Sequence, residues 1–311
     1  MFQQVLRTMY KDDITKADID ALEHDQWHEK LWQQLTAQQL HEVGLQDAGD
    51  FLDVCALHRL SGYYAAPIPF IEHTLACNVL AFLKEPIHDG IYTITRSHIV
   101  PWARAASYVV VIERHALHIY DIANAHIQHD VNIAAEPRDT VTWQGEPLQT
   151  YALTEAEHAH IRAMITMSSV YKITGAVERA VQLAIQFSKE REQFGRPIHR
   201  FQLVQQHIAK LAGEEAVLQA ACGSITVNDH FGMAAACIRA DEAVQTVTTS
   251  AHQVHAAIGV THEHTLHHTT RRLWAWREEG YSAREWKQLL ANDVATYEGT
   301  LWEQLTAFHK L

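Results

Sequence analysis

Basic residues, cysteine and long apolar runs are all scarce in this chain of 311 residues. Lysine and arginine number 25 against 37 acidic residues, and the resulting net charge of -12, with histidine neutral, argues against a general nucleic-acid binder. The four cysteines are scattered, without the spacing of a metal site or a disulfide framework, so we expect a reducing, cytoplasmic location. We also expect neither a signal peptide nor a membrane span, because no apolar stretch is long enough.

The pattern of apolar residues divides the chain into three regions. Residues 1–88 form an N-terminal helical region, in which apolar residues recur at helical spacing. Residues 89–150 hold short β-branched runs and predict a small β section, with one or two strands expected in its polar part after residue 124. Residues 151–311 return to helical spacing, with few prolines and glycines to interrupt it, and predict a C-terminal four-helix bundle.

Two sequence signals mark helix starts in the C-terminal region. Thr154 with Glu157, and Ser282 with Glu285, have the spacing of a capping box, in which each side chain bonds the other residue's backbone N–H. We therefore expect a long helix from Thr154 and a last helix from Ser282. The apolar residues of the last helix are Leu289, Leu290, Val294, Tyr297, Leu301, Leu305 and Phe308.

One segment joins a cation, an aromatic ring and a helix stop. Arg191 offers a planar fork that can hold a phosphate, and Phe194 offers a face for a flat ring. Gly195 and Pro197 end the helix there, so these side chains gather at an exposed point. On these residues alone, a well-made helix terminus with a cation near the negative end of the dipole is the simpler interpretation.

The ordered motifs around this segment resemble the C-terminal helical domain of acyl-CoA dehydrogenases. The resemblance covers roughly residues 154–280 and, more weakly, the N-terminal third. It implies a mainly helical, acyl-CoA dehydrogenase-like fold with a shortened β section. The stretches that carry the resemblance are residues 174–180, 187–198, 201–209, 253–259 and 270–274.

This resemblance implies a contact with FAD that is bound mainly by a neighbouring subunit. The family positions for that contact are occupied by Arg191, Gln193, Phe194, Ile198, Phe201, Gln202 and Gln253. Two glycines that usually follow the last position, and allow close backbone approach, are Ala256 and Ala257 here. The β section is also about half the size that the family uses to enclose the flavin ring, so we expect that this chain does not enclose the ring alone.

The family's substrate-binding and catalytic positions are poorly matched. Thr166 and Ser169 stand where the family commonly carries an Asp and an Arg that hold coenzyme A, and neither supplies the charge. The catalytic base of one family branch aligns with Glu279 or the glycine after it, and the base of another branch aligns with Ser168.

Glu279 and Glu298 are therefore the only two candidates for the base, and each has a simpler interpretation. Two glutamates before a glycine, as at Glu278 and Glu279, are typical of a solvated helix end. Glu298 lies in a Tyr-Glu-Gly-Thr sequence that spells the family's motif, but it comes about twenty residues too late, which favours a surface side chain. The sequence leaves the base unknown.

Six histidines crowd the region before and within residues 262–268. Histidines three or four residues apart can bind zinc, but no Cys or Asp in this stretch completes a recognisable site. We therefore expect no metal site, and solvated or interfacial histidines instead. The six are His252, His255, His262, His264, His267 and His268.

The resemblance favours a flavoprotein subunit that contributes to FAD-dependent α,β-dehydrogenation of an acyl-CoA thioester. It would share the flavin site with a full-length acyl-CoA dehydrogenase partner. One alternative is a self-sufficient, homo-oligomeric FAD enzyme with a relocated Glu base. Another is a non-catalytic protein that uses its helices only for oligomerisation. The sequence names neither the acyl chain, nor the electron acceptor, nor the partner.

Overall fold

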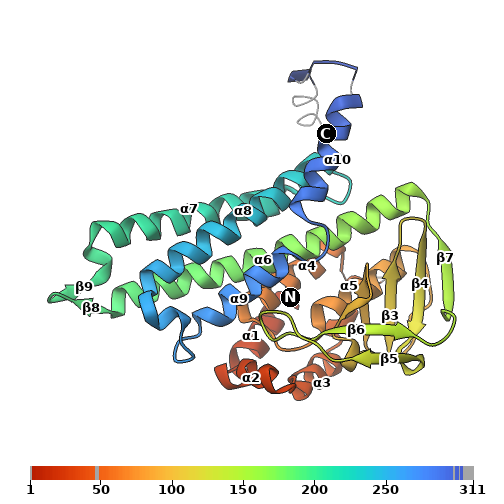
Figure 1. Ribbon diagram of the computed structural model, residues 1–311, viewed down its shortest axis with the longest axis horizontal. Coiled ribbons are helices and arrows are strands. Elements are labelled where there is room, and N and C mark those ends of the chain that lie inside the picture. Colours follow the sequence, from red (N-terminus) through yellow and green to blue (C-terminus); the bar gives the residue numbers. More distant parts are fainter. Residues whose placement is uncertain (1, 46–48, 297, 301, 304–311) are drawn as a thin grey trace.

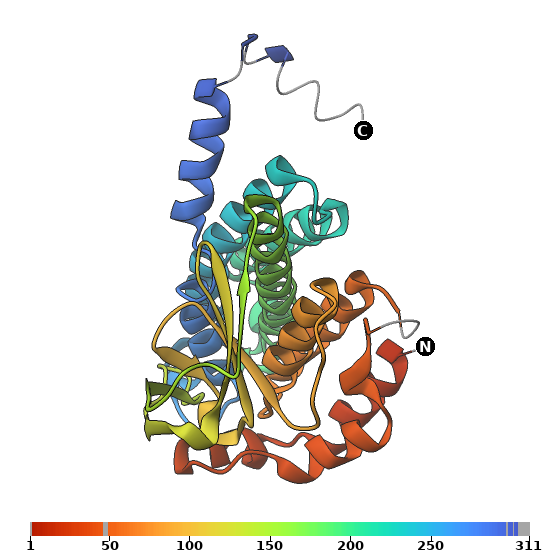
Figure 2. The same ribbon diagram turned by 90° about the vertical axis from the view of Figure 1, so that its right-hand side faces the viewer.

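The computed structural model describes residues 2–45, 49–296, 298–300 and 302–303 (Figure 1). Within them, a layer of N-terminal helices and a small β section lie against one side of a long helical assembly (Figures 1 and 2). None of the described helices is long and apolar enough to cross a membrane. The predicted fold, mainly helical with a small β section, is confirmed.

The N-terminal region is helical because each helix has a local start signal and an apolar face. Thr15 accepts from the backbone N–H of Asp18 in a capping box, and Asp50 accepts from the N–H of Asp53. The buried faces share a core that includes Leu6, Leu31 and Leu35. The helices are α1 (Phe2–Asp13), α2 (Lys16–Asp20), α3 (Glu29–Ala37), α4 (Phe51–Tyr64) and α5 (Phe70–Phe82).

The β section contains more strands than the sequence indicated. One sheet has the order β1-β3-β4-β7, with β1 and β3 parallel and the other neighbours antiparallel, and an antiparallel sheet has the order β2-β6-β5. Three strands, instead of one or two, follow residue 124, because backbone pairing also recruits short segments such as Ala125–Gln128 and Gln149–Ala152, which lack a β-branched run. The strands are β1 (Tyr92–Thr95), β2 (Ile99–Pro101), β3 (Tyr108–Ile112), β4 (Ala116–Asp121), β5 (Ala125–Gln128), β6 (Arg138–Trp143) and β7 (Gln149–Ala152).

The C-terminal region follows the predicted helix starts. The capping boxes at Thr154 and Ser282 both form, with Glu157 and Glu285 accepting from the two backbone N–H groups. Helices α6, α7 and α8 pack side by side, and α9 packs against α6 and α8 (Figure 1). The helices are α6 (Glu155–Glu190), α7 (Gln202–Ser224), α8 (His230–His255), α9 (Leu266–Arg277) and α10 (Ala283–Thr296).

The last helix packs against α8 and then projects from the body (Figure 2). Its first turns are anchored by Trp286, which is 1% exposed and whose indole N–H donates to Thr166 Oγ1 at 3.0 Å. The described helix ends at Thr296. Of the predicted apolar stripe, Tyr297, Leu301, Leu305 and Phe308 lie outside the described residues.

Two glycines fix how α4 crosses α6. A Cβ placed on Gly62 would lie 2.0 Å from the carbonyl oxygen of Lys172, and one on Gly175 would lie 1.9 Å from that of Arg59. Since real side chains never approach a backbone oxygen so closely, only glycine fits at either position. The crossing therefore sets the distance between the N-terminal helices and the bundle.

Candidate functional site

A cavity of about 770 Å³ lies where the β section meets α5, α6 and the residues that follow α9. This volume is in the range of small-molecule sites. Its apolar wall includes Leu75 from α5, Ile94 and Ile99 from the β section and Ile165 from α6. The cavity is thus built from all three regions of the chain, and each region also contributes polar side chains.

Glu279 lies in this cavity at the centre of a buried ion-pair network. The Arg138 side chain donates to Glu279 at 2.9 Å, Lys172 Nζ donates at 3.2 Å and the Asn132 amide at 3.2 Å. Burial opposes ionisation of the carboxyl, but the charges of Arg138 and Lys172 outweigh it and lower the pKa of Glu279 to about 2. Glu279 is therefore a permanently ionised partner of two cations and a weak proton acceptor at neutral pH.

The expectation of a solvated helix end holds for only one of the two adjacent glutamates. The Glu278 side chain is 78% exposed, whereas that of Glu279 is 24% exposed and turned toward Arg138. The difference arises because the turn after α9 directs consecutive side chains to opposite sides. Sequence spacing alone did not reveal that Glu279 pairs with Arg138, a buried arginine on β6.

A second layer of charge supports the network from behind. Glu136 accepts from Arg272 at 3.0 Å and from the indole N–H of Trp276 at 2.8 Å, and it also lies 3.3 Å from Arg138. Glu136 and Arg272 are almost fully buried. The whole network therefore contains two carboxylates and three cations, which alternate where β6, α6 and α9 meet. The carboxylates are Glu136 and Glu279, and the cations are Arg138, Lys172 and Arg272.

Glu72 on α5 is a cavity residue that the sequence analysis missed. Its carboxyl faces the cavity, and no other described side chain forms a hydrogen bond or an ion pair with it. Burial raises the pKa of Glu72, although Arg138 and Lys172 act in the opposite direction. The available signal was a single acidic residue within a mainly apolar helix, Phe70–Phe82.

The positions of the family's two alternative bases both line the cavity. Ser168 and Gly280 are there, together with Ser169. The Ser168 hydroxyl lies 2.8 Å from His58 Nδ1, and Nε2 of that imidazole lies 2.7 Å from the Thr74 hydroxyl, so Ser168 belongs to a buried polar chain. Ser168 carries no carboxylate, and of the two residues at the other matched position, Glu279 and Gly280, only Glu279 does.

Glu298 lies elsewhere. It is exposed and follows α10, which leads away from the body in Figures 1 and 2. Among the described residues, none of those that line the cavity comes from the segment after Gly280. Its position supports the interpretation of Glu298 as a surface side chain.

The predicted cofactor residues gather on a β-hairpin at the opposite end of α6. Strands β8 (Glu192–Gln193) and β9 (Arg196–Pro197) pair, and Phe194 and Gly195 form the turn with φ of 53° and 77°. The hairpin forms one extremity of the molecule in Figure 1. Phe194 is 92% exposed, and the Arg191 side chain forms no hydrogen bond or ion pair with any described residue.

The other predicted cofactor residues lie around the base of the hairpin. Ile198 and Phe201 are half-buried, and Gln202 is exposed at the start of α7. Gln253 is exposed near the end of α8, which reaches the same end of the assembly because the ring of His255 stacks on Phe187 with centroids 4.5 Å apart. The fold therefore brings residues from two distant sequence stretches to one end of the bundle.

Ala256 retains a glycine-like backbone although it is not a glycine. Its φ of 54° and ψ of -143° lie in a region that L-residues other than glycine rarely adopt. The adjoining Ala257 is exposed. The backbone thus adopts at Ala256 a conformation that glycine would adopt more easily.

The hairpin and the cavity lie well apart along α6. Nineteen residues of α6 separate Lys172 at the cavity from Arg191 at the hairpin. At 1.5 Å per residue, this is about 28 Å along the helix axis.

The histidines, expected to be solvated or interfacial, are only partly solvated. His255, His267 and His268 are buried, whereas His262 is exposed. Packing explains the burial, because His255 of α8 stacks on Phe187 and His268 of α9 lies against Asp20 of α2.

Helices surrounding a small β section, with a cavity between them, define the fold class of acyl-CoA dehydrogenases. A crystal structure of the ChsE4-ChsE5 complex from Mycobacterium tuberculosis has a TM-score of 0.85 over 96% of this chain and 97% of that chain, at 17% identity. A Tcur3481-Tcur3483 steroid ACAD variant has a TM-score of 0.84 over 94% of this chain and 96% of that chain, at 20% identity.

A family model matches the C-terminal region in sequence. Residues 152–278 match the family model described as acyl-CoA dehydrogenase, C-terminal domain. Acyl-CoA dehydrogenase IpdE2 of Mycobacterium tuberculosis (strain ATCC 25618 / H37Rv) is 35% identical over 124 residues, which are 39% of this chain and 38% of that protein. The 3-sulfinopropanoyl-CoA desulfinase of Paraburkholderia xenovorans (strain LB400) is 35% identical over 42% of this chain and 33% of that protein.

These alignments span little more than a third of each curated relative. Residues 152–278 are thus similar in sequence to the C-terminal domain of the acyl-CoA dehydrogenase family, and the likeness in fold extends over nearly the whole chain. The resemblance found in the sequence is thereby confirmed.

Proposed function

We propose that this chain is a subunit of a heteromeric acyl-CoA dehydrogenase. It contributes to FAD-dependent α,β-dehydrogenation of an acyl-CoA thioester and shares the flavin site with a full-length partner. The observation that carries this proposal is the exposed hairpin, which presents Arg191, Gln193 and Phe194 about 28 Å from the chain's own cavity. A cofactor contact on this hairpin would therefore be made to flavin that a neighbouring subunit binds.

The hairpin residues fit the chemistry of a dinucleotide. The Arg191 guanidinium is exposed and unengaged by described residues, so it can form a charged, two-pronged contact with a diphosphate. Phe194 can cover a flat ring, and Phe201, whose ring lies 4.3 Å from the Arg196 guanidinium, supports the hairpin from its base. When bound, FAD would supply the hydride acceptor, and this chain's part would be to hold it.

The size of the β section supports a partner. Seven short strands between residues 92 and 152 make up the section, and its cavity side is occupied by the paired charges of Arg138 and Glu279 rather than by an open ring-shaped slot. Two structures that share this fold carry two chain names, ChsE4-ChsE5 and Tcur3481-Tcur3483, in their descriptions. Both points favour an assembly of unlike subunits over a homo-oligomer.

A self-sufficient dehydrogenase is the second candidate function, and the Glu72 carboxyl favours it. This carboxyl faces the cavity without a side-chain partner, and its raised pKa suits a group that takes the α-proton of a thioester and then releases it. Glu279 is less suited, because Arg138 and Lys172 hold it ionised. Glu72 is thus the relocated carboxylate that this alternative requires.

The experiment is to purify the chain alone and together with a full-length acyl-CoA dehydrogenase encoded beside it. We expect the lone chain to be colourless or to carry well under one FAD per chain, and the assembled complex to carry flavin and oxidise acyl-CoA. The second candidate would be established if the lone chain carried stoichiometric flavin and turned over acyl-CoA, and if Glu72→Gln kept the flavin but lost the turnover. A complex without flavin would leave only the non-catalytic oligomerisation protein.

We also infer a cytoplasmic location. Cys55, Cys77, Cys222 and Cys237 are all free and buried, so the fold uses them as small apolar side chains and needs no oxidising compartment.

A further inference from the structure

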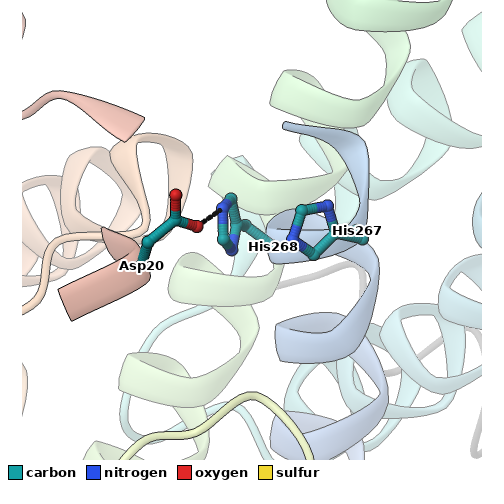
Figure 3. A group of neighbouring side chains, drawn as sticks. All are labelled: Asp20, His267 and His268. Carbon is teal, nitrogen blue, oxygen red and sulfur yellow. Dashed lines mark ion pairs between the residues drawn. The ribbon is translucent and has the colours of Figure 1, made fainter. Parts of the chain in front are cut away.

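Three ligand-type side chains meet between α2 and α9 (Figure 3). Asp20 is the last residue of α2, and His267 and His268 lie in the first turn of α9. One ligand atom from each side chain lies within 4.8 Å of the other two. His267 is 6% exposed and His268 is 4% exposed, whereas the Asp20 side chain is 36% exposed, so the group sits at the edge of a buried junction.

The tautomer of His267 leaves a lone pair turned into this junction. Its Nδ1 lies 2.7 Å from the carbonyl oxygen of His264, and since a carbonyl only accepts, Nδ1 carries the proton. Its Nε2 is therefore the unprotonated nitrogen, and it is buried without a hydrogen-bond partner among the described residues. Donation from the far ring nitrogen to a backbone carbonyl is the arrangement that orients metal-binding histidines.

The other two ligand atoms form a close pair. Lys16 Nζ donates to Asp20 Oδ2, and the second carboxylate oxygen, Oδ1, faces His268 on α9. Asp20 Oδ1 and His268 Nε2 lie 2.8 Å apart, yet both are buried atoms without a well-directed hydrogen bond among the described residues.

We propose that Asp20, His267 and His268 bind one divalent transition-metal ion of the zinc class, with water in the remaining position. Two neutral imidazoles and a carboxylate are a common donor set for this class. A tetrahedral ion would hold its ligand atoms about 3.3 Å apart, so the 2.8 Å pair would open slightly and the wider separations would close.

The site reverses the expectation of no metal, which rested on the lack of an Asp or Cys near the histidines. The fold supplies Asp20 from α2 instead, almost 250 residues earlier. The ion would link α2 to α9 through its ligands. Lys16 and Arg271 stand nearby and weaken cation binding, while Glu23, which pairs with Arg271 at 2.6 Å, offsets part of that charge.

The test uses the full chain, purified without a histidine tag, stripped with EDTA and dialysed. Zn²⁺ is then added, and bound metal is counted by elemental analysis after a second dialysis. We expect close to one Zn²⁺ per chain for the wild type, and binding weakened at least tenfold in Asp20→Asn, His267→Ala and His268→Ala. His126→Ala removes an exposed histidine on β5 and serves as the matched control. It should bind as the wild type does.

Co²⁺ gives a readout that needs no variant, since a site with nitrogen and oxygen ligands and fewer than six donors produces intense visible absorption. Zn²⁺ should abolish that absorption by competition. The proposal is overturned if the wild type retains no metal, or if Asp20→Asn retains as much as the wild type, which would show adventitious binding by surface histidines. Should a histidine variant fail to fold, Asp20→Asn and the Co²⁺ spectrum still decide the question.

Discussion

Arg191→Ala is the most direct test of the shared flavin site. The side chain is exposed and contacts no described residue through hydrogen bonds or ion pairs, so its removal should change the free energy of unfolding by less than about 0.5 kcal/mol. If the guanidinium clamps the FAD diphosphate across a subunit interface, a charged bidentate contact of about 1.5–3 kcal/mol disappears. Flavin affinity should therefore fall roughly ten- to a hundredfold.

The measurement is flavin fluorescence released on dilution of the assembled complex, with the partner subunit present in every sample. Arg191→Lys should restore only part of the affinity, because an ammonium group cannot form the two-pronged contact. Arg200→Ala is the matched control, since Arg200 is also exposed and lies close to the hairpin but is not one of the predicted contacts.

Equal flavin retention in Arg191→Ala and the wild type would refute the cofactor role of the hairpin. The same loss in Arg200→Ala would show a general effect of positive charge. Circular dichroism of each variant separates these outcomes from unfolding, which the exposure of Arg191 makes improbable.

The remaining predictions concern stability and the base. Gly175→Ala should lower the free energy of unfolding by at least about 1–3 kcal/mol, because its Cβ would lie 1.9 Å from a backbone oxygen of α4. Gly213→Ala on α7, where a Cβ meets nothing within 4 Å, should be neutral or stabilising in the same urea titration. Ala256→Gly should raise the melting temperature, since glycine relieves about 1 kcal/mol of backbone strain at this φ; a fall would contradict the turn geometry. Glu279→Gln should be less stable than the wild type at pH 7 by on the order of 3 kcal/mol. Because the folded-state pKa of Glu279 is about 2 and its usual value is 4.5, the wild type's advantage should shrink as the pH falls from about 4.5 toward 2, and a pH-independent gap would argue against this ion pair. Glu298→Gln should change neither flavin binding nor turnover of the complex; lost turnover with flavin retained would make Glu298 the base.

Local signals in the sequence predicted local structure well. The capping box at Thr154 needs only Glu157, three residues away, and the turn at Gly195 needs only the glycine's backbone freedom. The charge network could not be predicted in this way. Whether Glu279 faces water or Arg138 depends on how β6 packs against the end of α9, which is set by contacts between residues about 140 positions apart.

The same reason explains the other two omissions. Glu72 is notable in the sequence only as one acidic residue in an apolar helix, and its role depends on what lies opposite it. Asp20 has no sequence relation to His268, yet the fold places the two side chains 2.8 Å apart. Sites formed by residues from distant segments therefore could not be predicted from the sequence.

Helix α6 joins the hairpin to the cavity as one continuous rod. No proline interrupts it between Glu155 and Glu190, so the hydrogen bonds of its backbone give it no built-in hinge. A partner that pushes the hairpin sideways would therefore tilt the whole helix, and a tilt of about 2° shifts a point 28 Å away by about 1 Å. Lys172 lies at about that distance from the hairpin. A partner that docks on the hairpin would therefore shift Lys172 and, through it, the Glu279 carboxylate in the cavity.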